Sequence, residues 1–336
     1  MKTVYITGLN GSSGKIHIGH YLGFLKPFVE MQNSNKNDSL IGFVADLHGL
    51  TDPFNSIKGN SKNLLLSLIA SGLDAKKTLI FNQSDVPSHT ELMWVLTCQT
   101  SIGVLERMTQ YKDKSKKFAM ANGTSTIPCG IFLYPTLMAS DILLYDAKYV
   151  IVGQDQTQHV ELTRDIAEKF NKKYGETFVL PEAVITKGEE KKIYSLNNPG
   201  VKKMSKSEPE GCLWMLDSDE DIEKKIKKAL TDNLNKVHFD PINQPGISNL
   251  MTIYKAISQK SYEEIEKKYE SSPNYSFFKK DLIVLIQNLC KSYKEKYLIW
   301  SKKTKEIKKI LSDNAAKASK TASKKVDLVY KKIGIR

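Results

Sequence analysis

Two short segments of this chain carry residue types that could hold a triphosphate. The first, GLNGSSGKIHIGH at residues 8–20, joins an expected strand to an expected helix. Its small residues let backbone N–H groups approach a phosphate, and the helix N-terminus adds free N–H groups and a positive dipole end. His17 and His20 lie three residues apart on one side of the first turn, so both could donate hydrogen bonds to phosphate oxygens. Polar capping of the helix is the alternative interpretation of these histidines.

This first segment differs from a P-loop. The P-loop pattern GxxxxGK[ST] needs a Ser or Thr directly after its lysine to bind magnesium. In this chain Ile16 follows Lys15, and the spacing of the glycines also differs. We therefore expect a phosphate-binding turn of another kind.

The second segment is KKMSKS at residues 202–207. Mobile lysines such as Lys203 and Lys206 can neutralise charge that builds on a polyphosphate, which helps most in the transition state. The alternative interpretation is a basic linker. The pattern KMSKS rarely arises by chance, which favours the first interpretation.

The elements around these segments alternate between apolar runs and helical stretches. We expect strands at 4–7, 40–45, 79–81 and 149–152, and helices at 18–31, 57–71, 89–108, 134–145 and 156–172. Pro135 would lie in the first turn of its helix, residues 112–123 would form a surface loop, and 188–192 a tight turn. This alternation predicts a parallel sheet with helices on both faces, with ligands at the carboxyl ends of the strands.

The remainder of the chain is expected to be helical. From residue 219 onward only helical patterning is present, with long stretches at 282–311 and 315–332. The predicted fold class is therefore α/β: a Rossmann-like parallel-sheet, nucleotide-binding domain with a C-terminal all-helical domain. We expect the first domain at 1–201 with a helical insertion at about 105–185, a loop at 202–212, and the helical domain at 213–336.

Charge is distributed unevenly along the 336 residues. The net charge is +13, and residues 291–336 contain 15 Lys or Arg against 4 Asp or Glu, so +11 lies in that stretch. Such a lysine-rich end suggests contact with a phosphate backbone, although a solvated basic helix in a lysine-rich organism explains it equally well. The four cysteines lack the spacing of a zinc or redox motif, and no apolar run is long enough to span a membrane. A cytoplasmic protein is expected.

The two phosphate-binding segments together resemble the class I aminoacyl-tRNA synthetases, in which HIGH is followed about 180 residues later by KMSKS. Further segments make the chain similar to the bacterial-type tryptophanyl-tRNA synthetases, from about residue 2 to residue 330. These segments are DLHGLT at 46–51, LERMTQ at 105–110, YPTLMASDILLY at 134–145, VGQDQTQHVELTRD at 152–165 and PGISNL at 245–250.

One helix face gives an independent view of the amino-acid pocket. Tyr134, Met138 and Asp141 fall at positions i, i+4 and i+7. If buried, the Asp141 carboxylate needs a donor, and an indole N–H or a phenol O–H would serve, so this residue alone does not choose between tryptophan and tyrosine. The resemblance implies the indole. Related tyrosine enzymes typically carry a Tyr two residues before the glycine that corresponds to Gly8, where this chain has Ile6, and that absence favours tryptophan.

The resemblance also implies roles for individual residues. The catalytic residues would be His17, His20, Lys203 and Lys206. ATP would be bound by Asn10, Gly11, Ser12, Gly19, His20, Gly153, Gln154, Asp155, Ile193, Lys203, Met204, Ser205, Lys206 and Ser207. Tryptophan would be bound by Ile6, His48, Tyr134, Met138, Asp141, Val150, Val152 and Gln156. For Val150 and Val152 ordinary strand core is the alternative, and for His48 a structural role. Ile6 replaces the Phe of many relatives and offers no aromatic face.

The implied reaction is the activation of L-tryptophan with ATP, with loss of pyrophosphate, followed by transfer of tryptophan to tRNA(Trp). Magnesium would arrive with ATP, no dedicated metal site is expected, and a homodimer is implied. Three rivals remain: a tyrosyl-tRNA synthetase, a regulatory paralogue that no longer aminoacylates, and a nucleotidyltransferase that adenylates another acceptor. Intact HIGH and KMSKS segments argue against the second, and the long basic helical part against the third.

Overall fold

The centre of the molecule is a parallel sheet. The computed structural model describes residues 2–9, 15–34, 38–51, 60–122, 127–185, 193–205 and 208–336, with the backbone alone for 60, 61 and 117–122. Five strands pair in the order β3-β2-β1-β4-β5, and every pair is parallel. The strands are β1 (Val4–Leu9), β2 (Ser39–Val44), β3 (Thr78–Asn82), β4 (Tyr149–Val152) and β5 (Glu182–Ile185). The predicted α/β class is confirmed.

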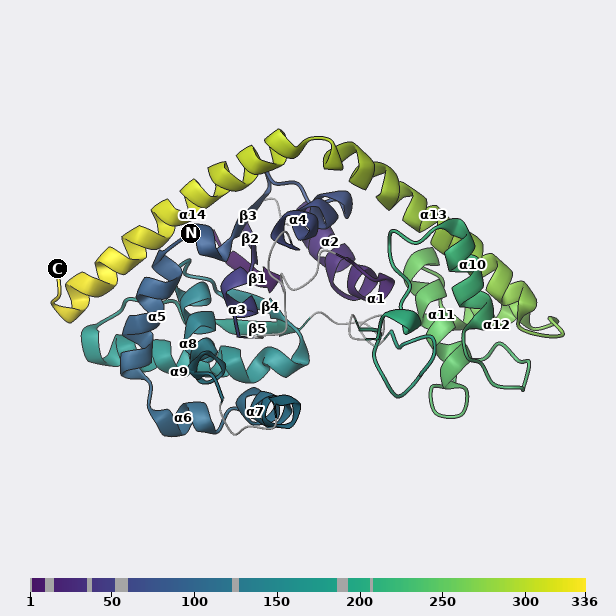
Figure 1. Ribbon diagram of the computed structural model, residues 1–336, viewed down its shortest axis with the longest axis horizontal. Helices are drawn as coiled ribbons and strands as arrows, with labels where there is room; N and C mark the ends of the chain where they lie inside the picture. Colours follow the sequence, from purple (N-terminus) through teal and green to yellow (C-terminus); the bar gives the residue numbers. More distant parts are fainter. Residues whose placement is uncertain are drawn as a thin grey trace.

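Helices cover the sheet and build the rest of the molecule (Figure 1). Those before β5 are α1 (Ile18–His20), the π-helical turn η1 (Tyr21–Leu25), α2 (Lys26–Ser34), α3 (Asp46–Gly49), α4 (Asn60–Ala70), η2 (Gln83–Asp85), α5 (Ser88–Gln99), α6 (Ile102–Glu106), α7 (Thr109–Asn122), α8 (Cys129–Leu143), η3 (Gln154–Gln156) and α9 (Thr157–Tyr174). Those after it are η5 (Pro209–Gly211), α10 (Asp219–Lys228), α11 (Pro245–Ser258), α12 (Tyr262–Tyr269), α13 (Ser276–Ser301) and α14 (Thr304–Ile333). In the described part of the chain, no helix combines the length and apolar character needed to cross a membrane.

Alternation along the strands sends side chains to two separate cores. Leu9, Leu40 and Val44 belong to one core, together with residues of α2 and α4. Ile6 and Phe43 belong to the other, together with residues of α5, α8 and α9. This is the arrangement expected when a parallel sheet is buried on both faces.

Two elements of the first half differ from the sequence prediction. Residues 112–122 are not a surface loop but belong to α7, whose Tyr111 packs edge-on against Phe132 of α8 with ring centroids 5.1 Å apart. Because α7 has so few apolar residues, it shows little helical periodicity in the sequence. Helix α8 begins at Cys129, so Pro135 lies inside it and not in its first turn. Proline removes one backbone donor there, and continuous burial of 134–137 against its neighbours offsets the loss. The predicted turn at 188–192 lies outside the described residues.

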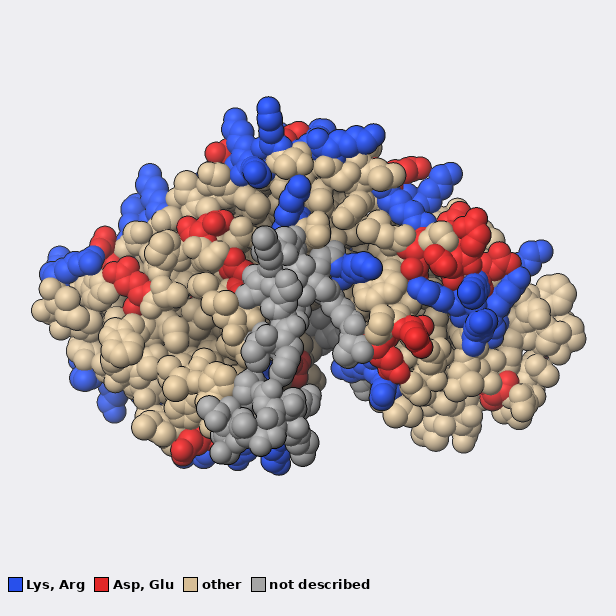
Figure 2. Space-filling model, in the orientation of Figure 1, with Lys and Arg blue, Asp and Glu red and all other residues tan. Residues whose placement is uncertain are grey.

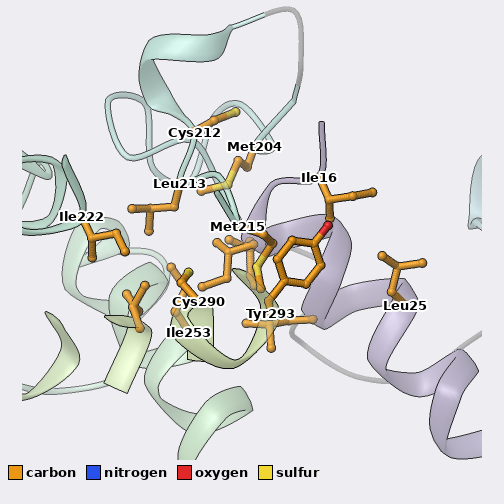
Figure 3. Close-up of a cluster of buried hydrophobic side chains, with 14 of the residues drawn as sticks. Ile16, Leu25, Met204, Cys212, Leu213, Met215, Ile222, Ile253, Cys290 and Tyr293 are labelled. Carbon is orange, nitrogen blue, oxygen red and sulfur yellow. The ribbon is translucent and has the colours of Figure 1, made fainter. Parts of the chain in front are cut away.

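The helices α10 to α13 gather beyond the sheet (Figure 1). Local signals fix their ends: the Ser218 hydroxyl caps α10, and Ser261 with Glu264 forms a capping box at the start of α12. One hydrophobic core joins this group to the first sheet face (Figure 3). It contains side chains from the residues around α1 and η1, from KMSKS and the segment that follows it, and from the helical group: Ile16, Leu25, Met204, Cys212, Leu213, Met215, Ile222, Ile253, Cys290 and Tyr293.

The last helix, α14, returns to the sheet. Helix α13 ends at Ser301, inside the predicted helical stretch 282–311. After residues 302–303, α14 runs back along β3 and α5 (Figure 1). Its apolar stripe, spaced three or four residues apart, lies in the second core and consists of Ala315, Ala318, Ala322, Val326 and Val329. The Lys325 ammonium also lies 2.6 Å from an Asp146 carboxylate oxygen. The predicted helical unit 213–336 is therefore divided in space, with α10–α13 on one side and α14 on the sheet.

Candidate active site

The strand order places a topological switch point between β1 and β4. The chain leaves β1 toward β2 and reaches β4 on the other side, so connections diverge from the carboxyl ends of these two strands. Ligands bind at such a switch point in open α/β sheets. The segment after β4 begins with the predicted residues Gly153, Gln154 and Asp155. After β1 the predicted residues Asn10, Gly11 and Ser12 lie outside the described residues.

The two histidines of HIGH have different surroundings. His17 is buried, and its Nδ1 accepts a hydrogen bond from the His20 backbone N–H at 3.1 Å, so it caps α1. The His20 ring is partly exposed and stacks on Phe24, with centroids 5.6 Å apart. The capping interpretation therefore holds for His17. A phosphate-binding role for both remains a prediction.

The HIGH segment lies against the segment that leads into KMSKS. A Cβ on Gly19 would lie 3.5 Å from Ile193 Cβ, which is an ordinary van der Waals contact, and 3.2 Å from His17 Nδ1, so a larger residue at position 19 would crowd the His17 ring. The Met204 N–H then donates to the Ile193 carbonyl at 3.0 Å. Predicted ATP-binding residues from opposite ends of the first domain are thus brought together.

Within KMSKS, the methionine and the first lysine point to different environments. Met204 is buried in the core that reaches the helical group, whereas Lys203 is exposed and Ser205 is partly buried. The backbone after the loop pairs with the HIGH segment, because Ile18 N–H donates to the Leu213 carbonyl at 2.8 Å. The loop is therefore anchored at its methionine with Lys203 facing solvent. Lys206 and Ser207 lie outside the described residues.

Asp141 is the centre of a buried polar network. Its side chain is on α8, and the residue is 1% exposed. The Oδ1 atom accepts from Gln83 Nε2 at 2.6 Å and lies 2.6 Å from His89 Nδ1. The Oδ2 atom lies 2.9 Å from His48 Nε2. His89 Nε2 lies in turn 2.8 Å from the Tyr145 hydroxyl.

This network keeps the carboxylate ionised. Burial alone would raise the pKa of Asp141, because it penalises the charged form. Hydrogen bonds from His48 and His89 outweigh burial and lower the pKa to about 2. Asp141 therefore presents a negative acceptor inside the protein at neutral pH.

Tyr134 lies next to His48, one of the residues that contact Asp141. Its hydroxyl lies 2.9 Å from His159 Nε2, its ring meets the His48 ring edge-on at 6.1 Å, and the Lys114 ammonium lies 3.9 Å from its centroid. Burial and, to a lesser extent, Asp155 raise the pKa of the Tyr134 hydroxyl, which stays protonated. The Tyr134 hydroxyl can therefore serve as a hydrogen-bond donor or acceptor.

The remaining predicted residues occupy the margins of this region. The Gln156 Nε2 donates a hydrogen bond to an Asp155 carboxylate oxygen at 2.6 Å. Met138 and Val152 are partly buried. Ile6 and Val150 are 1% and 2% exposed, inside the second core. For Val150 this burial agrees with the strand-core alternative, whereas Val152 is only partly buried. Contact of any of them with tryptophan remains a prediction.

A scan against family models matches residues 2–291 to the tRNA synthetases class I (W and Y). The chain belongs to this family. A tryptophan–tRNA ligase of Malacoplasma penetrans is 45% identical over 340 residues, covering 100% of this chain and 98% of the relative. A tryptophanyl-tRNA synthetase structure from Mycoplasma pneumoniae has a TM-score of 0.85 at 34% identity and covers 100% and 99% of the two chains. One from Campylobacter jejuni, complexed with ADP and tryptophan, has a TM-score of 0.82 at 35% identity and covers 99% and 100%.

Sequence reasoning missed four residues of this class I site. Gln83, His89, Lys114 and His159 were not predicted, although each contacts Asp141 or Tyr134. Gln83 directly follows β3, so the rule that ligands gather at carboxyl ends of strands could have identified it. The other three lie on helices, and only the tertiary packing brings them to the site.

Titration of His159 should weaken the fold in mild acid. The residue is fully buried, and burial, followed by Lys114, lowers its pKa from 6.5 to about 4. The unfolded chain therefore binds a proton between pH 6.5 and 4 that the folded chain refuses, so stability is complete above pH 6.5 and decreases toward pH 4. We expect a loss of ~3 kcal/mol over this window.

The measurement compares denaturant unfolding of the wild type and His159→Gln from pH 7 to pH 4.5. Because glutamine does not titrate, the stability advantage of the wild type should shrink as the pH falls. An advantage that stays constant with pH would contradict the assignment.

Proposed function

We propose that this chain is a tryptophan–tRNA ligase that activates L-tryptophan with ATP and transfers it to tRNA(Trp). The tryptophan carboxylate, ionised at neutral pH, attacks the α-phosphorus of ATP in line. One P–O bond forms, the bond to pyrophosphate breaks, and tryptophanyl-AMP results. A tRNA terminal ribose hydroxyl then attacks the activated carbonyl and releases AMP. No covalent enzyme intermediate is needed, so positioning and charge stabilisation supply the catalysis.

The observation that carries this proposal is the ionised Asp141 at 1% exposure. The three described donors to Asp141 leave one acceptor position on Oδ2, which an indole N–H could fill. The tryptophan-bound relative from Campylobacter jejuni supports this assignment. Tyr134, whose ring meets the His48 ring edge-on, would hold the polar end of the amino acid.

ATP would bind at the switch point between the carboxyl ends of β1 and β4. Gly19 and Ile193, two predicted ATP-binding residues, lie next to one another, and the complex of a relative with ADP supports nucleotide binding. His17 and His20 would hold phosphates, and Lys203 would reach the departing pyrophosphate. Magnesium would enter with ATP and add charge neutralisation. Within the described residues, no group of three or more His, Cys, Asp or Glu side chains is arranged to hold a metal ion.

The helical part would hold the tRNA. Figure 2 shows Lys and Arg side chains along the outer edge over α14 and its junction with α13. Exposed lysines of this edge are Lys302, Lys303, Lys305, Lys308, Lys309, Lys317, Lys320, Lys324, Lys331 and Lys332. Such a row attracts a phosphate backbone over a long path. The α10–α13 group would form the anticodon-binding part.

Two further properties complete the proposal. A homodimer is supported by large apolar side chains at the surface of the first domain, since Trp94 is 69% and Ile102 is 67% exposed. A cytoplasmic location is supported by four free cysteines, which suit a reducing compartment.

The test of the whole reaction is tRNA charging. Purified protein, ATP, magnesium and total tRNA are incubated with labelled tryptophan, and acid gels resolve the charged species. We expect label on one tRNA species, tRNA(Trp), with none when tyrosine replaces tryptophan. Charging with tyrosine, or no charging by a folded protein, would overturn the proposal.

A further inference from the structure

The Asp141 carboxylate receives donors from three separate elements. Gln83 lies in η2, His89 near the start of α5, and His48 in α3. Two of these donors meet Oδ1 and the third meets Oδ2. Because each carboxylate oxygen has two acceptor positions, the described contacts fill Oδ1 and leave one position on Oδ2.

The proton positions on His89 follow from this network. An ionised carboxylate only accepts, so His89 Nδ1 carries the hydrogen. In the neutral ring Nε2 is then an acceptor, and the Tyr145 hydroxyl at 2.8 Å donates to it. Tyr145 thus supplies the donor that the remaining nitrogen of this His89 tautomer needs. The His89 ring also packs against the rings of Phe43 and Phe81, at centroid distances of 5.8 and 6.0 Å.

Gln83 adds a second acceptor. Its side chain is fully buried, its Nε2 is used on Asp141, and its Oε1 has no hydrogen-bond partner among the described residues. Around Asp141 the described donors are therefore already used, whereas two acceptor atoms, Asp141 Oδ2 and Gln83 Oε1, can still accept a hydrogen bond.

We propose that Gln83, His89 and Tyr145 are positioning residues that make this site selective for a ring that donates a hydrogen bond and accepts none. An indole N–H is a donor only. A phenol O–H can donate as well, but its oxygen also carries lone pairs. These would face acceptors and donors that are already engaged, so the buried lone pairs would have no donor. This inference rests on the proposed function and adds a reason for the choice of tryptophan over tyrosine.

The experiment measures pyrophosphate exchange with tryptophan and with tyrosine for a graded set of variants. Tyr145→Phe removes a single oxygen. His89→Asn keeps an N–H near the position of Nδ1, and His89→Leu removes it. Phe81→Leu is the matched control, because Phe81 packs on both His89 and Tyr145 without a polar contact to Asp141.

We expect His89→Leu to raise the KM for tryptophan about ten- to a hundredfold, with the KM for ATP nearly unchanged and the preference over tyrosine reduced. Tyr145→Phe should act in the same direction by a smaller factor, and His89→Asn should restore most of the preference. Phe81→Leu should lower Tm and leave the preference intact.

An unchanged tryptophan-to-tyrosine preference in folded His89→Leu and Tyr145→Phe would overturn the inference. So would an equal loss of preference in Phe81→Leu, since that would show a packing effect. Exchange by the wild type distinguishes a failure of the proposed function from a failure of this inference. If the wild type shows no tryptophan-dependent exchange, the proposed function fails. If it does show exchange, the variants test only the positioning role.

Discussion

Replacing Asp141 by asparagine should lower kcat/KM for tryptophan by about two to three orders of magnitude. The substitution removes the negative acceptor for the indole N–H. It also places an amide among donors from Gln83 and His89 that already converge on Oδ1. Because the side chains that contact Asp141 include none of the predicted ATP-binding residues, the KM for ATP should stay within about threefold. Steady-state pyrophosphate exchange with each substrate varied in turn measures both quantities.

Asp146→Asn is the matched control for this substitution. Asp146 lies just after the same helix and makes its ion pair with Lys325 of α14, away from Asp141. Its positive φ of 51° is tolerated by asparagine. The control should retain the wild-type KM for tryptophan. Equal losses in the two variants would show that the effect comes from α8 and not from the carboxylate.

Replacing Lys203 by alanine should lower kcat about a hundredfold while the KM for ATP changes little. The ammonium would meet pyrophosphate charge that develops as the bond breaks, so its contribution appears in the transition state. The structure favours an effect on kcat over an effect on the KM for ATP, because buried Met204 anchors the loop while the Lys203 side chain is exposed. Single-turnover formation of tryptophanyl-AMP isolates this step from product release.

Lys202→Ala provides the comparison. Lys202 is the adjacent exposed lysine, and its ammonium lies 3.9 Å from a Glu208 carboxylate oxygen. Its removal should alter the rate by less than about threefold, because exposed ion pairs contribute little. Similar losses for both lysines would indicate general electrostatic attraction of ATP and contradict a specific role for Lys203.

The parts of the fold that the sequence predicted well are those with local signals. Buried strands such as 40–45 and 149–152 stand out as apolar runs between helical stretches, and the structure has β2 and β4 there. Helix α7 was missed because its contacts with α8 come from Tyr111 and from Lys114 over the Tyr134 ring. These contacts leave no apolar periodicity to detect.

The position of α14 could not be predicted from pattern alone. Its stripe of alanine and valine indicates a buried face, but the same stripe would fit the helical group or the sheet. In the structure α14 lies along β3, its stripe packs in the second core, and Lys325 forms an ion pair with Asp146. A boundary drawn from composition therefore groups α14 with its neighbours in sequence.

The candidate site shows the same limit. The spacing of Tyr134, Met138 and Asp141 predicted a face of α8 with a carboxylate that needs a donor. The residues that orient this carboxylate, Gln83 and His89, are more than 50 residues away in the sequence. Their roles follow from hydrogen bonds that exist only once the sheet and helices have assembled.

Amino-acid-dependent pyrophosphate exchange tests the central claim most directly, with each of the twenty amino acids supplied separately. We expect exchange with tryptophan and none above background with tyrosine or phenylalanine. Exchange with tyrosine in place of tryptophan would contradict the assignment of the Asp141 pocket. Absence of exchange with every amino acid, from protein shown to be folded, would contradict the proposed activation of an amino acid.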